Sequence, residues 1–142
     1  MRIIGLSDAN ILGIHSMALI AASGECGISV HSIAEITKCS QHHLTKVVDT
    51  LSKSGLIYAT RGPSGGFHLG RSADEISLLE IYEAISGEID QNDLCLSHSN
   101  SKIQLDFFKN VCNELSEEFL KYLKLTKLSD IQTKAEKILN KK

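Results

Sequence analysis

Residues 38–71 decide the fold of this chain: they begin Lys38-Cys39-Ser40-Gln41-His42-His43-Leu44-Thr45-Lys46 and close on Arg61-Gly62-Pro63-Ser64-Gly65-Gly66-Phe67-His68-Leu69. The first part predicts a helix capped by Ser40, with Leu44, Val47, Val48 and Leu51 on its inner face. The second predicts strands at 56–60 and 67–69, joined by a glycine-rich turn that holds the only proline of the chain. A helix with a polar N-terminal end and a basic hairpin beside it are typical of a winged helix-turn-helix DNA binder.

Apolar periodicity predicts further helices on both sides of this stretch, at 8–22, 32–38, 77–86, 102–125 and 128–139. The long helix carries an apolar stripe wider than one small core needs, which favours a partner helix from a second subunit; packing within one subunit is the alternative. The stripe, and hence the expected dimer interface, consists of Leu105, Phe108, Val111, Leu115, Phe119 and Tyr122.

The expected fold class is mainly α: a winged helix-turn-helix domain with a two-stranded β wing and a long C-terminal dimerisation helix. We expect a DNA-binding domain at 1–86, a sensor-type loop at 87–101, and the dimerisation and C-terminal helices at 102–142. A chain of 142 residues with 42% hydrophobic residues can bury a real core. It has no apolar run of about 18 residues and no signal-peptide pattern, so we expect no membrane contact and a cytoplasmic location.

Charge is distributed in opposed blocks along the chain. Residues 38–71 hold five Lys or Arg against one acid, a net charge of +4, whereas residues 74–118 hold two Lys against eleven acids, a net charge of −9. Residues 121–142 hold seven Lys against two acids, a net charge of +5. Such blocks, hidden in an overall charge of −2, predict one cationic face for a polyanion.

The partner that fits the 38–71 block is double-stranded DNA. The N-terminal residues of the helix can reach base edges, Lys46 and Lys53 can neutralise phosphates, and Arg61 suits a narrow minor groove. Glycines in the turn let the wing backbone approach DNA closely. The predicted DNA-contacting residues are Ser40, Gln41, His42, His43, Thr45, Lys46, Lys53, Arg61, Gly62, Ser64, Gly65, Gly66 and His68.

The quoted strings resemble the Rrf-two family of bacterial transcription regulators. Three further strings share the likeness: Ser54-Gly55-Leu56-Ile57, Ile76-Ser77-Leu78-Leu79-Glu80-Ile81-Tyr82 and Leu125-Thr126-Lys127-Leu128-Ser129-Asp130-Ile131. The resemblance covers nearly the whole chain, and Arg-Gly-Pro-x-Gly-Gly-Phe is its most specific motif. It implies a homodimeric winged-helix repressor whose long helices cross, each subunit reading half of a near-palindromic operator.

Many members of that family sense iron–sulfur status or nitric oxide through a cluster held by three loop cysteines and a fourth ligand. This chain departs from the pattern, because its 87–101 loop holds only Cys95, and Ser101 and Phe107 stand where further cysteines would follow. The resemblance implies Cys95, His98 and Asp8 as candidate cluster ligands, and Cys112 of the long helix is a further candidate. Clusters strongly prefer thiolates, so no cofactor is assigned. An iron–sulfur cluster, an oxidisable Cys95 thiol and a signal independent of both stay open.

Two other function classes are weighed against DNA binding. No arrangement of nucleophile and base, or of paired carboxylates, predicts an enzyme, and no Gly-Lys-Ser/Thr follows the glycines as a phosphate-binding loop requires. A winged helix used only for protein contacts is the remaining alternative. Such a module would not need the +4 block at 38–71, and its binding would not depend on salt as DNA binding does.

Overall fold

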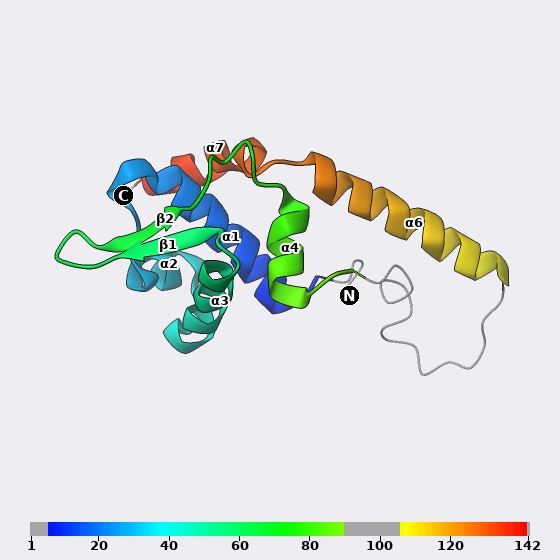
Figure 1. Cartoon of the computed structure of the whole chain (residues 1–142), viewed down its shortest axis with the longest axis horizontal. Coiled ribbons are helices and arrows are strands. Elements are labelled where there is room, and N and C mark those ends of the chain that lie inside the picture. The colour runs from blue at the N-terminus through cyan, green and yellow to red at the C-terminus, as the bar shows by residue number, and fades with distance from the viewer. Residues whose placement is uncertain (1–5, 90–105, 142) are drawn as a thin grey trace.

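The computed structural model describes residues 6–89 and 106–141, with side chains in the second range from residue 110. It is a mainly helical winged helix-turn-helix with a two-stranded antiparallel wing and C-terminal helices, as predicted (Figure 1). The described elements are α1 (Asp8–Ser23), the 3-10 turn η1 (Gly24–Cys26), α2 (Val30–Thr37), α3 (Gln41–Lys53), β1 (Ile57–Thr60), β2 (Gly66–Leu69), α4 (Leu78–Ser86), α6 (Asp106–Leu125) and α7 (Leu128–Leu139).

Serine hydroxyls start four of the helices. Ser7, Ser29, Ser40 and Ser77 each accept a hydrogen bond from the backbone N–H three residues later, which satisfies a donor that the first turn leaves open. The prediction that the second helix begins at residue 32 is therefore wrong by two residues: the helix begins at Val30, and Ser29 is its cap. Ile28, just before this cap, pairs with Phe67 of the wing.

The wing is a hairpin in which Ile57 pairs with Leu69 and Thr60 with Gly66. Its base is tied to the chain after α1 by two backbone bonds, Phe67 N to Ile28 O at 2.8 Å and Ile28 N to Phe67 O at 3.3 Å. Glycine is required at residue 66, because a Cβ there would lie 2.8 Å from the Ile28 nitrogen. Gly62, at the turn, has a φ of 111°, a region that favours glycine.

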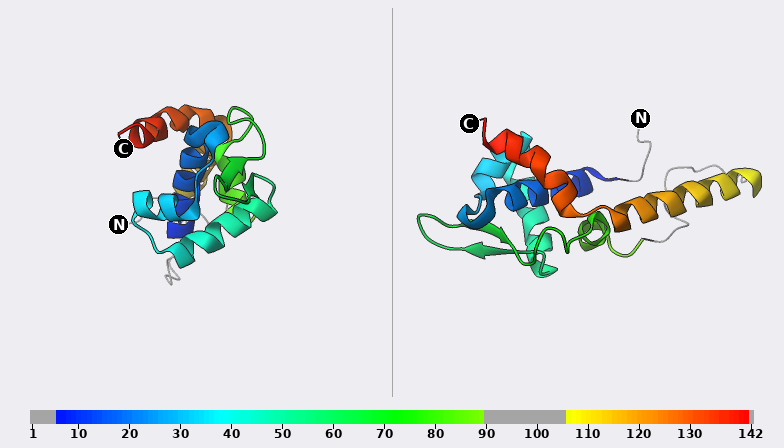
Figure 2. Two further views of the ribbon diagram at one scale, coloured as in Figure 1. Left: turned by 90° about the vertical axis from the view of Figure 1, so that its left-hand side faces the viewer. Right: turned by 90° about the horizontal axis from the view of Figure 1, so that it is seen from above.

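The core gathers around α1, against which α3, α4 and α7 pack. The largest side chains buried there are Met17, Ile20, Ile33, Leu44, Leu51, Ile76, Ile81 and Leu128. Views from two directions place α3 and α7 on opposite sides of α1 (Figures 1 and 2). The wing and α6 extend from this core in opposite directions.

The exit of α6 from the core is fixed at its C-terminal end. The Leu78 amide donates to Thr126 O at 3.0 Å and the Leu128 amide to Ile76 O at 2.8 Å, forming an isolated bridge between Ser77 and Lys127. The Tyr82 ring on α4 meets the Phe119 ring edge-on, with centroids 6.4 Å apart. In the described ranges no helix has the length and apolarity that a membrane crossing needs.

Candidate nucleic-acid interface

The N-terminal end of α3 presents a row of polar side chains to solvent. Gln41, His42, Thr45 and Lys46 are exposed, while Leu44, Val47, Val48 and Leu51 on the other face are buried and fix the helix to α1 and α4. The His43 amide donates to Ser40 Oγ at 3.2 Å and the Leu44 amide to Ser40 O at 3.0 Å, so the amides that the first turn leaves open are those of Gln41 and His42. An exposed helix end of this kind can enter a groove and can favour a phosphate.

Two of the predicted contacts on this helix have partners within the protein. Thr45 Oγ1 donates to Gln41 O at 2.7 Å, so in this rotamer its hydroxyl can only accept from a base or water. His43 is half-buried and lines a hollow beside His15 and Cys39. Gln41, His42 and Lys46 are therefore the freest side chains on the reading end.

Lys53 lies in the last turn of α3, seven residues beyond Lys46. At about 1.5 Å per residue that places it roughly 10 Å further along the axis, on nearly the same face. Both are exposed, so the pair can follow a phosphate backbone while the N-terminal residues face bases.

Arg61, Gly62 and Ser64 are exposed at the wing turn, as a minor-groove or phosphate contact requires. Gly65 and Gly66 are half-buried and act through the backbone: a Cβ on Gly65 would lie 2.5 Å from Thr60 O. The Gly65 amide donates to Gly62 O at 2.9 Å, which closes the turn.

His68 sits in the base of the wing rather than at its tip. Its Nε2 lies 3.1 Å from Thr60 Oγ1, its ring stacks on Tyr58 with centroids 5.3 Å apart and planes at 22°, and it fills the space beside Gly27. The imidazole thus braces the hairpin against η1. Its stacking partner Tyr58 is 52% exposed and is a contact candidate that sequence reasoning missed, although strand alternation after buried Ile57 signals it.

Arg71 belongs to the +4 block but is used within the protein. Its guanidinium donates to Glu80 Oε1 at 2.5 Å, and this hydrogen bond, with the charge of Glu80, raises the Arg71 pKa. Partial burial raises the pKa of the Glu80 carboxyl, but hydrogen bonds from the Ser77 amide, Arg71 and the Ser77 hydroxyl outweigh it and leave that pKa below its ordinary value. Lys38, by contrast, is exposed in the turn before α3 and adds a cation that sequence reasoning did not single out.

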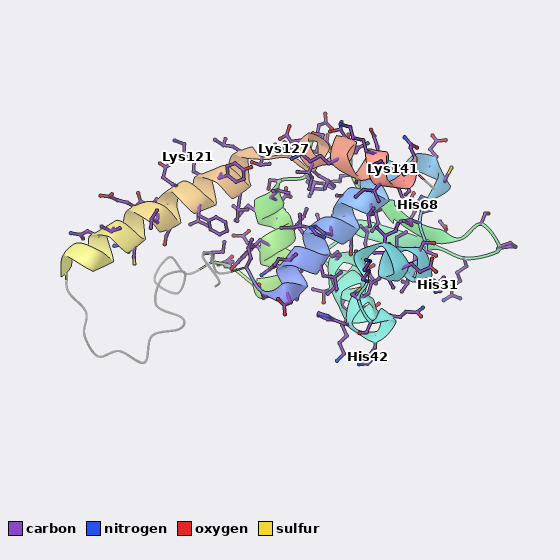
Figure 3. All side chains as sticks on the ribbon, turned by 180° about the vertical axis from the view of Figure 1, so that it is seen from behind. His31, His42, His68, Lys121, Lys127 and Lys141 are labelled. Carbon is purple, nitrogen blue, oxygen red and sulfur yellow. The ribbon has the colours of Figure 1, made fainter. Side chains whose placement is uncertain are left out.

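The second basic block lies on another side of the molecule. Lys127 and Lys141 are on or beside α7, whereas His42 marks the free end of α3 on the opposite side of the fold (Figure 3). The lysines of α7 therefore do not extend the α3 and wing surface.

One side of α6 exposes large apolar side chains among its charged residues. Val111, Leu115 and Tyr122 are 47%, 63% and 64% exposed, and Leu125 at 67% lengthens the predicted stripe. Cys112, Leu123 and Ser116 are buried, and Phe119 is half-buried against Tyr82, so this side faces the same subunit. Leu105 and the side chain of Phe108 lie outside what the structure describes.

The candidate cluster ligands are not brought together in the described part of the fold. Asp8 is exposed at the start of α1, Cys112 is buried on α6, and Cys95 and His98 fall outside the described residues. Cys26 and Cys39 lie in η1 and in the turn before α3. No described group of three or more His, Cys, Asp or Glu can hold a metal. This donor set does not fit an iron–sulfur cluster, which prefers thiolates.

Comparisons with known proteins agree with this geometry. The family model Rrf2, described as an iron-dependent transcriptional regulator, matches residues 6–134. An HTH-type transcriptional regulator from Aquifex aeolicus is 30% identical over 141 residues, 94% of either chain. Staphylococcus aureus CymR is 26% identical at a TM-score of 0.74, covering 89% of this chain and 96% of CymR.

The global cysteine regulator CymR of B. subtilis has the same fold, with a TM-score of 0.75 and 24% identity over 90% of this chain and 95% of that one. The family match spans most of the chain and places it among transcriptional regulators rather than enzymes. Rrf2 regulators bind DNA, which agrees with the exposed polar end of α3 and the wing. The chain therefore belongs to the Rrf2 family of helix-turn-helix transcriptional regulators.

Proposed function

We propose that this chain is a homodimeric, sequence-specific repressor that reads a near-palindromic operator. The observation that carries the proposal is the exposed reading end of α3, where Gln41, His42 and Lys46 are exposed and make no side-chain bond to the described residues, with Arg61 at the neighbouring wing turn. Gln41 suits bidentate contact with adenine in the major groove. Lys46, Lys53 and Arg61 supply affinity through phosphates and a narrow minor groove.

Dimerisation is proposed from the apolar face of α6. Val111, Leu115, Tyr122 and Leu125 expose apolar side chains on one side of α6, with Glu118 among them, and water wets them in the single subunit. A second copy related by a two-fold axis presents the same stripe, so each can cover the other. Two reading ends related by this axis would require an operator with inverted half-sites, and a dimer bound there would block transcription sterically.

The test is selection of bound duplexes from a random DNA library, followed by affinity measurements on the selected site. We expect an inverted repeat, strong weakening of binding as salt rises, and relaxed specificity at one position per half-site in Gln41→Ala. Lys137→Ala on α7 is the control and is expected to keep wild-type affinity. Recovery of no common sequence, or affinity insensitive to salt, would favour the protein-interaction alternative instead.

A further inference from the structure

A hollow between α1, α2 and α7 lies outside the α3 and wing surface. Its volume is about 510 Å³, within the range of small-molecule sites. Ile14, Leu19, Ile36, Ile131 and Ile138 give it an apolar lining. Ile138 is 49% exposed at its edge, an exposure that costs free energy unless something covers the groove.

The polar residues that line this groove favour an anionic ligand. Lys134 and His15 line it together with Thr37, and none of the described lining residues is acidic. Lys134 makes no ion pair with the described residues, and His15, which a mid-helix position would place in the core, is exposed. An apolar cavity with a free ammonium at its rim fits a molecule with an apolar body and one anionic group.

The groove also touches the turn that aims α3. Thr37, the last residue of α2, lines it and donates to Ile33 O at 2.7 Å, with its Oγ1 3.1 Å from Cys39 Sγ. Lys38 has a φ of 54°, so the turn is in a left-handed conformation that a non-glycine residue rarely adopts. Ser40, two residues on, caps α3. A second hollow of about 280 Å³ shares His15 and Thr37 and reaches His43 on α3.

We propose that the α1–α2–α7 groove binds a small amphiphilic carboxylate, and that occupancy shifts the last turn of α2 and weakens operator binding. Lys134 holds the carboxylate, the isoleucines enclose the apolar body, and the Thr37–Ser40 turn transmits the change to α3. The binding site stands on the groove alone, whereas its effect on DNA rests on the proposed function.

The binding test uses the full chain and the fluorescence of 1-anilinonaphthalene-8-sulfonate, an apolar anion of suitable size. We expect saturable binding that octanoate displaces and octylammonium does not. Lys134→Glu should weaken binding by about tenfold, because it replaces an attraction by a repulsion at an exposed position on the edge of the groove. Lys137→Glu makes the same change of charge on the same helix outside the groove and should bind as wild type does.

The results that would overturn the site are equal displacement by octanoate and octylammonium, or equal weakening in the two lysine variants. Binding by a Leu115→Asp monomer but not by wild type would show that a second copy covers the groove instead. For the regulatory step, octanoate should lower operator affinity in wild type and Lys137→Glu but not in Lys134→Glu. If octanoate displaces the dye but leaves operator affinity unchanged, the coupling is refuted. If the ligand-free wild-type protein does not bind the operator at all, that result counts against the proposed function alone.

Discussion

Replacing Lys46 by Ala tests the assignment of the α3 and wing surface most directly. Four cations on or beside that surface are exposed in each subunit: Lys38, Lys46, Lys53 and Arg61. Arg71, the fifth cation of the block, is bound to Glu80. The structure therefore separates cations that can neutralise phosphates from one that is already neutralised, which the net charge of the sequence does not.

The magnitude follows from the number of free cations. A dimer has at most eight, and each neutralised phosphate contributes about −0.9 to the slope of log affinity against log salt, so the slope is at most about −7. Lys46→Ala removes two contacts per dimer and should make the slope shallower by about 1.8. At about 1 kcal/mol for each contact, affinity should fall by about thirtyfold.

Fluorescence anisotropy with the selected operator, over a range of salt concentrations, measures both quantities. Arg71→Ala is the matched control: it also removes one positive charge, but we expect the salt slope of wild type because Arg71 serves Glu80. The reasoning is refuted if Arg71→Ala flattens the slope as much as Lys46→Ala does. If Lys46→Ala keeps the wild-type salt slope, the assignment of α3 as a DNA-contacting helix is also refuted.

Three further predictions follow from the other sites. Leu115→Asp, which puts a charge on a side chain 63% exposed in one subunit, should give a folded monomer in analytical ultracentrifugation; a dimer of wild-type stability would contradict the α6 interface. Glu80→Gln should lower the free energy of unfolding at neutral pH. The Glu80 pKa is lowered in the fold, so the contribution of Glu80 to the free energy of unfolding is present above the ordinary pKa of 4.5 and is lost as pH falls below it. A stability difference between wild type and Glu80→Gln that persists in acid would contradict this. Protein purified without oxygen should lack cluster absorption and stoichiometric iron, because the 87–101 loop offers a single thiolate, Cys95, and clusters prefer thiolates; iron that disappears in Cys95→Ala would overturn this.

Local signals in the sequence were enough to predict most of the elements. The Ser40 cap and the inward face of α3 are both set by residues three or four apart, and both predictions are confirmed. The bounds predicted for the last helix are those of α7. The start of α2 was missed because the prediction begins the helix at Ser32, whereas Ser29 accepts from the Ser32 amide and caps the helix.

Several features that the sequence did not reveal depend on side-chain contacts between residues that lie apart in the chain. His68 is predicted as a DNA contact on the wing, but its packing against Gly27 and Tyr58 shows that it braces the hairpin. The sequence counts Arg71 in the basic block, whereas the structure pairs it with Glu80. The apolar stripe of the long helix predicted its exposed side, whereas the inward turn of Phe119 depends on the ring of Tyr82 on another helix.

The way α6 is attached to the core links dimerisation to operator reading. The bridge between Ser77 and Lys127 and the edge-on contact of Tyr82 with Phe119 fix α6 to the helices that carry α3. In a two-fold dimer built on the α6 stripe, the separation of the two α3 ends is therefore set by packing rather than by a flexible linker. Operators read by such a dimer must keep their half-sites at a fixed spacing, near one helical turn of about 34–36 Å or a multiple of it. A base pair inserted between the half-sites should then cost more affinity than a mismatch within one, because it misplaces a whole reading end.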